Sequence, residues 1–134
     1  ARARARSLCA EMHAGFGALR QQGPMNIEAR LPEVGARIWA EHPALRQDVA
    51  RIESMWAEAL QASGGPMLFG AFGAADAFFA PVCMRLRGYA LPVSDTTRAY
   101  VERVAAVPAV AQWIADALAE HDFIAEDEPY RQAP

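Results

Sequence analysis

The segment Gly70-Ala71-Phe72-Gly73-Ala74-Ala75-Asp76 leads into an apolar run that extends to Leu86. This order is typical of the start of a buried helix. Gly73 is then the N-cap residue, and the carboxylate of Asp76 accepts a hydrogen bond from the Gly73 backbone N–H. A helix that is apolar on most sides is normally central and buried. We therefore predict a central helix over 74–87, with Gly73 and Asp76 as structural residues.

Four more helices are predicted where apolar residues recur at helical spacing, over 5–20, 43–63, 95–106 and from 108 onward. Pro43 and Pro108 suit the first position of a helix, because proline lacks the backbone N–H that would be unpaired there. Gly64 is a plausible left-handed cap after the second of these helices. Asp95 is the predicted N-cap of the helix over 95–106.

The remaining segments show weaker patterns. Residues 24–42 are expected to be irregular, with at most a short helix around Val34, Ile38 and Trp39, and residues 66–69 to be a short extended connector. In the last helix Trp113 is expected to face inward as a structural residue. No segment alternates between apolar and polar residues for long enough to predict a strand. The predicted class is all-α, a helical bundle of about five helices.

Composition narrows the functional classes. The chain has 134 residues, of which 53% are hydrophobic and 22% charged, as in a globular domain. It lacks an apolar run long enough for a membrane span, and its net charge of -3 argues against a nucleic-acid partner. All basic residues are Arg, which excludes Schiff-base and P-loop chemistry. Two cysteines make no disulfide framework, so a cytoplasmic location is expected. Because the chain begins with Ala, we expect a fragment or a processed product.

The segment over 70–76 and the helix after it resemble a mark of the glutathione-transferase family, in its C-terminal all-helical domain. In that family a Ser or Thr caps the central helix, whereas this chain has Gly73 there. The use of Arg without Lys, together with the abundant Ala, suggests a bacterial source with a GC-rich genome. Residues 101–104 and 108–114 look like the next two helices of the same family, and the resemblance covers about 8–125. The resemblance implies a glutathione-transferase-like helical domain over 1–125. The acidic residues near the end of the chain predict a solvated acidic tail over 126–134.

The resemblance also implies a function. In this family glutathione is held by an N-terminal thioredoxin-like domain, and nothing in this chain predicts its strands. The helical domain forms a wall of the pocket for a hydrophobic electrophile and much of a homodimer interface. We therefore expect an electrophile-binding and dimerisation domain, with glutathione as the co-substrate of the parent protein and no activity in this chain alone. Two alternatives stay open: a non-catalytic protein-interaction module of this fold, and a ligand-sensing domain of a transcription regulator.

The resemblance places the first helix at the active-site cleft, so we expect substrate-binding residues there: Glu11, Met12, His13 and Phe16. Met12 and Phe16 are one turn apart and would share a face, although the same spacing also fits a core stripe. On the central helix Phe79, Arg85 and Tyr89 are further candidates. Arg85 suits an anionic group of a substrate, or simply the negative end of the helix dipole.

No catalytic residue and no metal site are predicted. The sequence offers no pairing of a nucleophile with a base. Cys9 and His13 are four residues apart and share a helix face, but two ligands are too few for a metal site. Cys83 is expected to be inert packing, His42 a turn residue, and His121 a residue without a partner.

Overall fold

Helices make up the whole regular structure of the described part of the chain. A computed structural model describes residues 1–133. Within them the helices are α1 (Arg2–Ala14), α2 (Gly17–Gln22), α3 (Pro32–Glu41), α4 (Pro43–Ser63), α5 (Ala74–Gly88), α6 (Asp95–Ala106) and α7 (Pro108–Glu120). The predicted all-α helical bundle is confirmed. There are seven helices rather than about five, because the first predicted helix is divided and 32–41 is helical.

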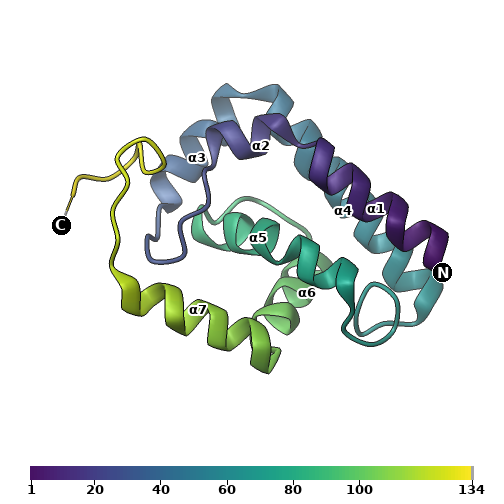
Figure 1. The fold of residues 1–134 in the computed structure, drawn as a ribbon. Coiled ribbons are helices and arrows are strands. Elements are labelled where there is room, and N and C mark those ends of the chain that lie inside the picture. The colour runs from purple at the N-terminus through teal and green to yellow at the C-terminus, as the bar shows by residue number, and fades with distance from the viewer. Residues whose placement is uncertain (134) are drawn as a thin grey trace.

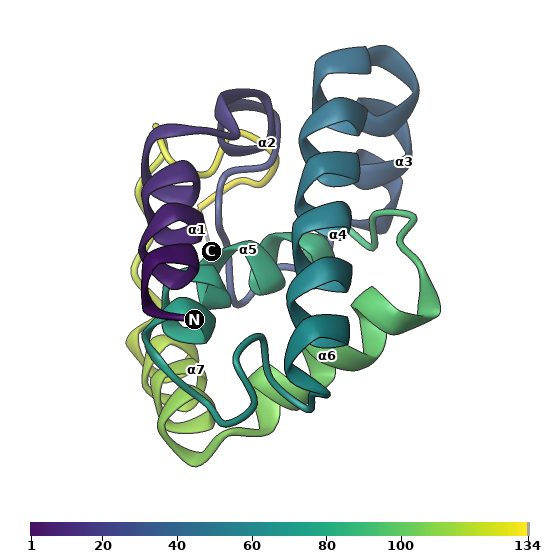
Figure 2. The ribbon, with the colours of Figure 1, turned by 90° about the vertical axis from the view of Figure 1, so that its right-hand side faces the viewer.

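Helix α5 is central, as predicted. It crosses the middle of the bundle, with α1 and α4 on one side and α6 and α7 on the other (Figures 1 and 2). It packs against α1 and α6, while α4 contacts α2, α3 and α6. Three rings join α4, α5 and α6: Trp56 meets Phe79 and Tyr100 edge to face, at centroid distances of 5.4 and 4.7 Å. All three side chains are buried, so this aromatic cluster lies in the core between these three helices.

The carboxylate of Asp76 is buried at the start of α5, where it accepts three hydrogen bonds. Oδ2 accepts the Gly73 N–H at 2.9 Å, while Oδ1 accepts the Leu68 N–H at 3.1 Å and the Tyr100 hydroxyl at 2.8 Å. Burial, the nearby Cys83 and Asp76 itself raise the pKa of Tyr100, so its hydroxyl stays protonated and donates. One side chain therefore connects the turn before α5 to α5 and α6.

The first predicted helix is interrupted, contrary to the expectation of one helix over 5–20. Helix α1 ends at Ala14, and Phe16 has a left-handed backbone with φ 58° and ψ 38° before α2 begins. The Phe16 ring is nevertheless buried in the core. In α2, the Leu19 N–H donates to Asp48 Oδ2 of α4 at 3.0 Å. The break therefore turns the chain so that both Phe16 and Leu19 reach the core.

Two further expectations about helix ends and turns are wrong, and one is confirmed. Ser94, not Asp95, is the N-cap of α6, since its Oγ accepts the Thr97 N–H at 3.2 Å. Residues 66–69 form a tight turn rather than an extended connector, because Met67 and Gly70 exchange two backbone hydrogen bonds. Gly70 has φ 98°, which glycine adopts without strain. Gly64 is the predicted left-handed cap of α4, with φ 79°.

The segment after α7 runs back across the chain to α2 and the residues that follow it (Figure 1). The Tyr130 hydroxyl donates to the Gln22 carbonyl at 2.6 Å, and Arg131 forms an ion pair with Glu28 at 3.0 Å. His121, for which the sequence suggested no partner, lies 3.1 Å from Glu28. The predicted acidic tail therefore includes residues that pack against the helical domain.

We expect Asp76→Ala to lower the free energy of unfolding by about 2–4 kcal/mol, because three donors lose their acceptor in a buried site. Tyr100→Phe is the matched control: it removes one of the three donors and should cost only about 1 kcal/mol. Urea denaturation of both variants measures the difference. An unchanged midpoint for Asp76→Ala would contradict the central position of this carboxylate.

Candidate functional site

A hollow opens between α1 and the start of α5, and we call it the α1–α5 hollow. Its volume is about 450 Å³. The first turns of α1 lie beside the beginning of α5, near the N-terminus of the chain (Figure 2). Helix α1 contributes four residues at positions i, i+3, i+4 and i+7, which share one face: Arg2, Ala5, Arg6 and Cys9. The other wall comes from the turn before α5 and its first two turns, with Phe69, Gly73, Ala74, Ala75, Asp76 and Phe78.

The surface of the α1–α5 hollow is mainly apolar. Phe78 is 46% exposed although it is a large aromatic residue, and Phe69 is partly buried against the core. Gly73 has no side chain, so the Asp76 backbone N–H lacks the acceptor that a Ser or Thr cap would supply. A Cβ at Gly73 would meet nothing closer than the Ala71 carbonyl oxygen at 3.9 Å. The helix start at this point is therefore open and uncrowded.

Arginines form the edge of the hollow. Arg2 and Arg6 stand one helical turn apart, and both are exposed. Neither makes a hydrogen bond or an ion pair with any of residues 1–133. Arg4, on another face of α1, is paired with Glu58 of α4 at 2.9 Å. The two guanidinium groups of Arg2 and Arg6, which we call the arginine rim, thus have no polar partner within the described residues.

The two thiols differ in access, and neither is prepared for nucleophilic attack. Cys9 is partly exposed at the hollow, where burial and then the charge of Asp76 raise the pKa of its thiol. Cys83 is fully buried in α5, and burial raises its pKa strongly. Since the thiolate is the nucleophile, neutral thiols are poor ones. The site can therefore bind a ligand, but its cysteines do not supply the chemistry.

Comparison with known protein families decides the identity of the fold. A family model described as glutathione S-transferase, C-terminal domain, matches residues 3–116. This chain belongs to that family. No match was found among curated proteins or among solved structures. The glutathione-transferase domain thus spans six of the helices and most of α7.

Two properties of the described residues of this glutathione-transferase domain bear on possible ligands. None of its helices has both the length and the apolar character that crossing a bilayer requires, as judged over residues 1–133. Within the same range, no three or more His, Cys, Asp or Glu side chains gather in a way that would hold a metal ion.

The four candidate residues predicted on the first helix do not line the α1–α5 hollow. Glu11 forms a two-point ion pair with Arg51, at 2.7 and 3.0 Å, and these bonds lower the pKa of Glu11. Met12 packs partly against the core, and His13 is exposed. Phe16 is 7% exposed and lies beyond the end of α1, so Met12 and Phe16 do not share a helix face.

The candidates on the central helix also lie elsewhere. Arg85 donates from Nε to the Gly23 carbonyl at 3.1 Å, and the Tyr89 hydroxyl donates to the Pro24 carbonyl at 2.7 Å. Burial raises the pKa of Tyr89 to about 12 and lowers the pKa of Arg85. Both side chains thus attach the turn after α2 to the end of α5. Phe79 is fully buried in the core.

Two smaller hollows flank the other sides of α5. One, of about 260 Å³, lies between α5 and α7 and is lined by Phe72, Pro81 and the predicted structural residue Trp113. Pro108 is the first residue of α7, which positions this wall. Trp113 was predicted to face inward, and its side chain is partly buried against the core.

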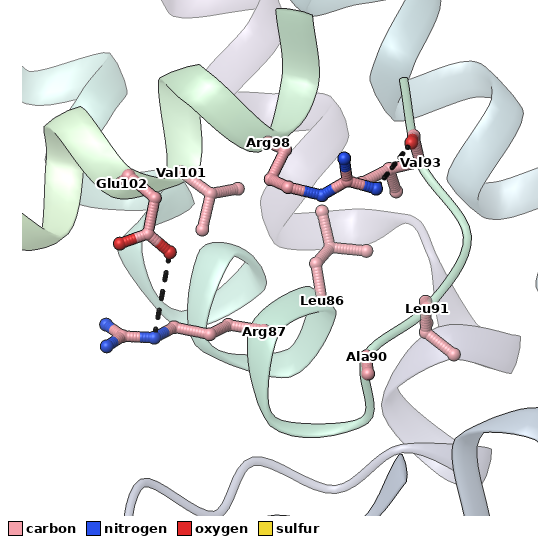
Figure 3. A pocket seen from close by; sticks show the side chains of 8 residues that line it. All are labelled: Leu86, Arg87, Ala90, Leu91, Val93, Arg98, Val101 and Glu102. Carbon is pink, nitrogen blue, oxygen red and sulfur yellow. Dashed lines mark hydrogen bonds and ion pairs between the residues drawn. The ribbon is translucent and has the colours of Figure 1, made fainter. Parts of the chain in front are cut away.

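The third hollow, of about 240 Å³, lies between the end of α5 and α6 (Figure 3). Its arginines already have acidic partners: Arg98 bonds to Asp95 at 3.0 Å and to the Val93 carbonyl at 3.3 Å, and Arg87 lies 3.8 Å from Glu102. Figure 3 shows the two arginine side chains extending in opposite directions. They therefore cannot both bind one small ligand in this arrangement.

Sequence reasoning singled out Gly73 and Asp76 as structural residues but assigned no residue of the α1–α5 hollow to ligand binding, although a signal for the α1 wall exists. Arg2, Ala5, Arg6 and Cys9 repeat at helical spacing on a face different from that of Leu8 and Met12. This second stripe of small and basic residues distinguishes the hollow face from the core face. Phe69 on the opposite wall has no such signal. It lies in the tight turn at 67–70, where no helical repeat marks which side chains point into the hollow.

The buried position of Phe16 leads to a paired prediction. Phe16→Ala should lower the free energy of unfolding by about 3–5 kcal/mol, as for other buried aromatic side chains. Met12→Ala should have a clearly smaller effect, because Met12 is only partly buried. Urea denaturation of the two variants tests this. If Phe16→Ala were as stable as the unchanged chain, the ring would not be part of the core.

Proposed function

We propose that this domain binds the hydrophobic electrophile of a glutathione transferase in the α1–α5 hollow, with glutathione as the co-substrate. The observation that carries the proposal is the hollow itself. Its volume of about 450 Å³ lies within the range of small-molecule pockets. The half-exposed Phe78 and the neighbouring, partly buried Phe69 give it an aromatic surface.

In this proposal the domain positions the electrophile and does not activate glutathione. The sulfur of the glutathione thiolate forms a bond to an electrophilic carbon, and the leaving group departs with its electron pair or the electrons move into the substrate. Thiolate stabilisation belongs to the thioredoxin-like domain of the family. The residues of this chain contribute orientation, because Phe69 and Phe78 hold the apolar body in one place, and this reduces the entropic part of the barrier.

The position of the hollow supports the same proposal. Ala1 and Arg2 lie at its edge. A glutathione-binding domain joined before α1 would therefore adjoin the hollow, and a thiolate held there would be close to an electrophile that contacts Phe78. Homodimer formation through the helical domain and a cytoplasmic location are further proposals, which rest on family membership alone. Sedimentation equilibrium tests the first of them, and the expected mass is that of two chains.

Binding of a neutral aromatic ligand tests the site directly. We expect 3,5-dinitrobenzamide to bind and to slow the alkylation of Cys9 by iodoacetamide, since Cys9 lines the hollow while Cys83 is fully buried. Phe78→Ala should weaken binding by about tenfold or more, as for loss of an apolar contact in a pocket. Ile124→Ala is the matched control, because Ile124 is 58% exposed and lies outside the hollow. If Cys9 is not protected, or if both variants bind equally, the interaction module is favoured instead.

The chain alone should not accelerate conjugation of glutathione to 1-chloro-2,4-dinitrobenzene. The reason is that the family holds and activates glutathione in its thioredoxin-like domain, while the two cysteines of this chain are neutral thiols. The measurement is the absorbance change of the conjugate with and without the chain. Turnover well above the uncatalysed rate would show that the helical domain itself activates glutathione.

A further inference from the structure

The charges around the α1–α5 hollow are unbalanced. Arg2 and Arg6 stand at its edge without partners among residues 1–133, four positions apart on one face of α1. The hollow has one acidic side chain, Asp76, and its two oxygens already accept three hydrogen bonds within the protein. No acidic side chain of the hollow is therefore free to pair with the arginine rim.

The other arginines near hollows show that this arrangement is specific. In the hollow between α5 and α6, Arg98 pairs with Asp95. Arg87 of the same hollow lies near Glu102 (Figure 3). On α1 itself, Arg4 lies between Arg2 and Arg6 in sequence but points to α4, where it pairs with Glu58. The arginine rim thus differs from its neighbours in facing an apolar recess with no counterion.

We propose that the α1–α5 hollow selects electrophiles that carry a carboxylate or sulfonate beside an apolar body. This inference rests on the proposed function, since it names the substrate class of the same site. The apolar body packs on Phe69 and Phe78, and the anionic group lies at the arginine rim. A guanidinium group is suited to this role, because its fork of N–H donors matches the two oxygens of a carboxylate. The positive end of the α5 dipole adds potential of the same sign.

A matched pair of ligands tests the selectivity. 3,5-Dinitrobenzoate and 3,5-dinitrobenzamide share one ring and nearly one shape, and they differ by one negative charge. We expect the benzoate to bind about three- to tenfold more tightly, a modest factor because both arginines are exposed to solvent. The preference should shrink in about 0.5 M NaCl, where exposed charges are screened. Isothermal titration of the 134-residue chain measures both constants.

Variants of the rim complete the test. Arg2→Gln with Arg6→Gln should abolish the preference for the benzoate, so that the two ligands bind with about equal constants, and Arg4→Gln, on another face of α1, should retain the preference. Thermal unfolding checks that the variants remain folded. Equal binding of the two ligands, or a preference that survives loss of both rim arginines, would overturn this inference but leave the proposed function in place. If neither ligand binds, the proposed function fails and this inference fails with it.

Discussion

The carboxylate of Asp76 joins three parts of the chain at one buried point. It accepts hydrogen bonds from the turn at Leu68, from the N-cap Gly73 and from Tyr100 of α6. A buried carboxylate is costly unless such donors compensate the loss of water. The three donors are also buried or partly buried. The carboxylate therefore needs these donors, and the donors need the carboxylate as their acceptor. The turn that bears Phe69 therefore depends on the same group as the start of the central helix.

The candidate site also depends on the hydrogen bonds of Asp76. Phe69 and Gly73 line the α1–α5 hollow, and both lie in the segment that Asp76 holds against α5. Glycine at position 73 leaves out the side chain that the family usually has there, and the hollow is open at that point. The family fold is thus a scaffold, and in the proposed function the residues placed around the hollow decide which ligand this member binds. Two unpaired arginines beside an aromatic surface favour an amphipathic anion over a purely apolar ligand.

Local patterns in the sequence predicted the elements that have local causes. Pro43 and Pro108 each start a helix, Gly64 ends one in the left-handed conformation, and the apolar run after Asp76 is central. The break at Phe16 was not predictable from periodicity, because Leu8, Met12, Phe16 and Leu19 fit one helical stripe. The left-handed backbone at Phe16 arises from tertiary packing, which brings both Phe16 and Leu19 into the core.

The site was less predictable than the fold for a related reason. Arg85 and Tyr89 are residue types that often bind a substrate. In this structure, however, both donate hydrogen bonds to backbone carbonyls of the turn after α2. Asp76 was predicted to bond to Gly73, three residues away, whereas its bond to Tyr100 spans 24 residues. The α1–α5 hollow likewise combines residues from α1 with others more than 50 positions later. Such contacts follow from the packing of helices and leave no local pattern.

Hydrogen exchange at the Leu68 amide tests the role of Asp76 most directly. The Leu68 N–H lies in a turn, where amides normally exchange through small local openings. If Asp76 holds this turn as part of the core, the Leu68 amide should exchange only when the whole domain unfolds, as slowly as the amide of the buried Val104 in α6. Exchange of Leu68 orders of magnitude faster than that of Val104, at the same pH and temperature, would contradict this account.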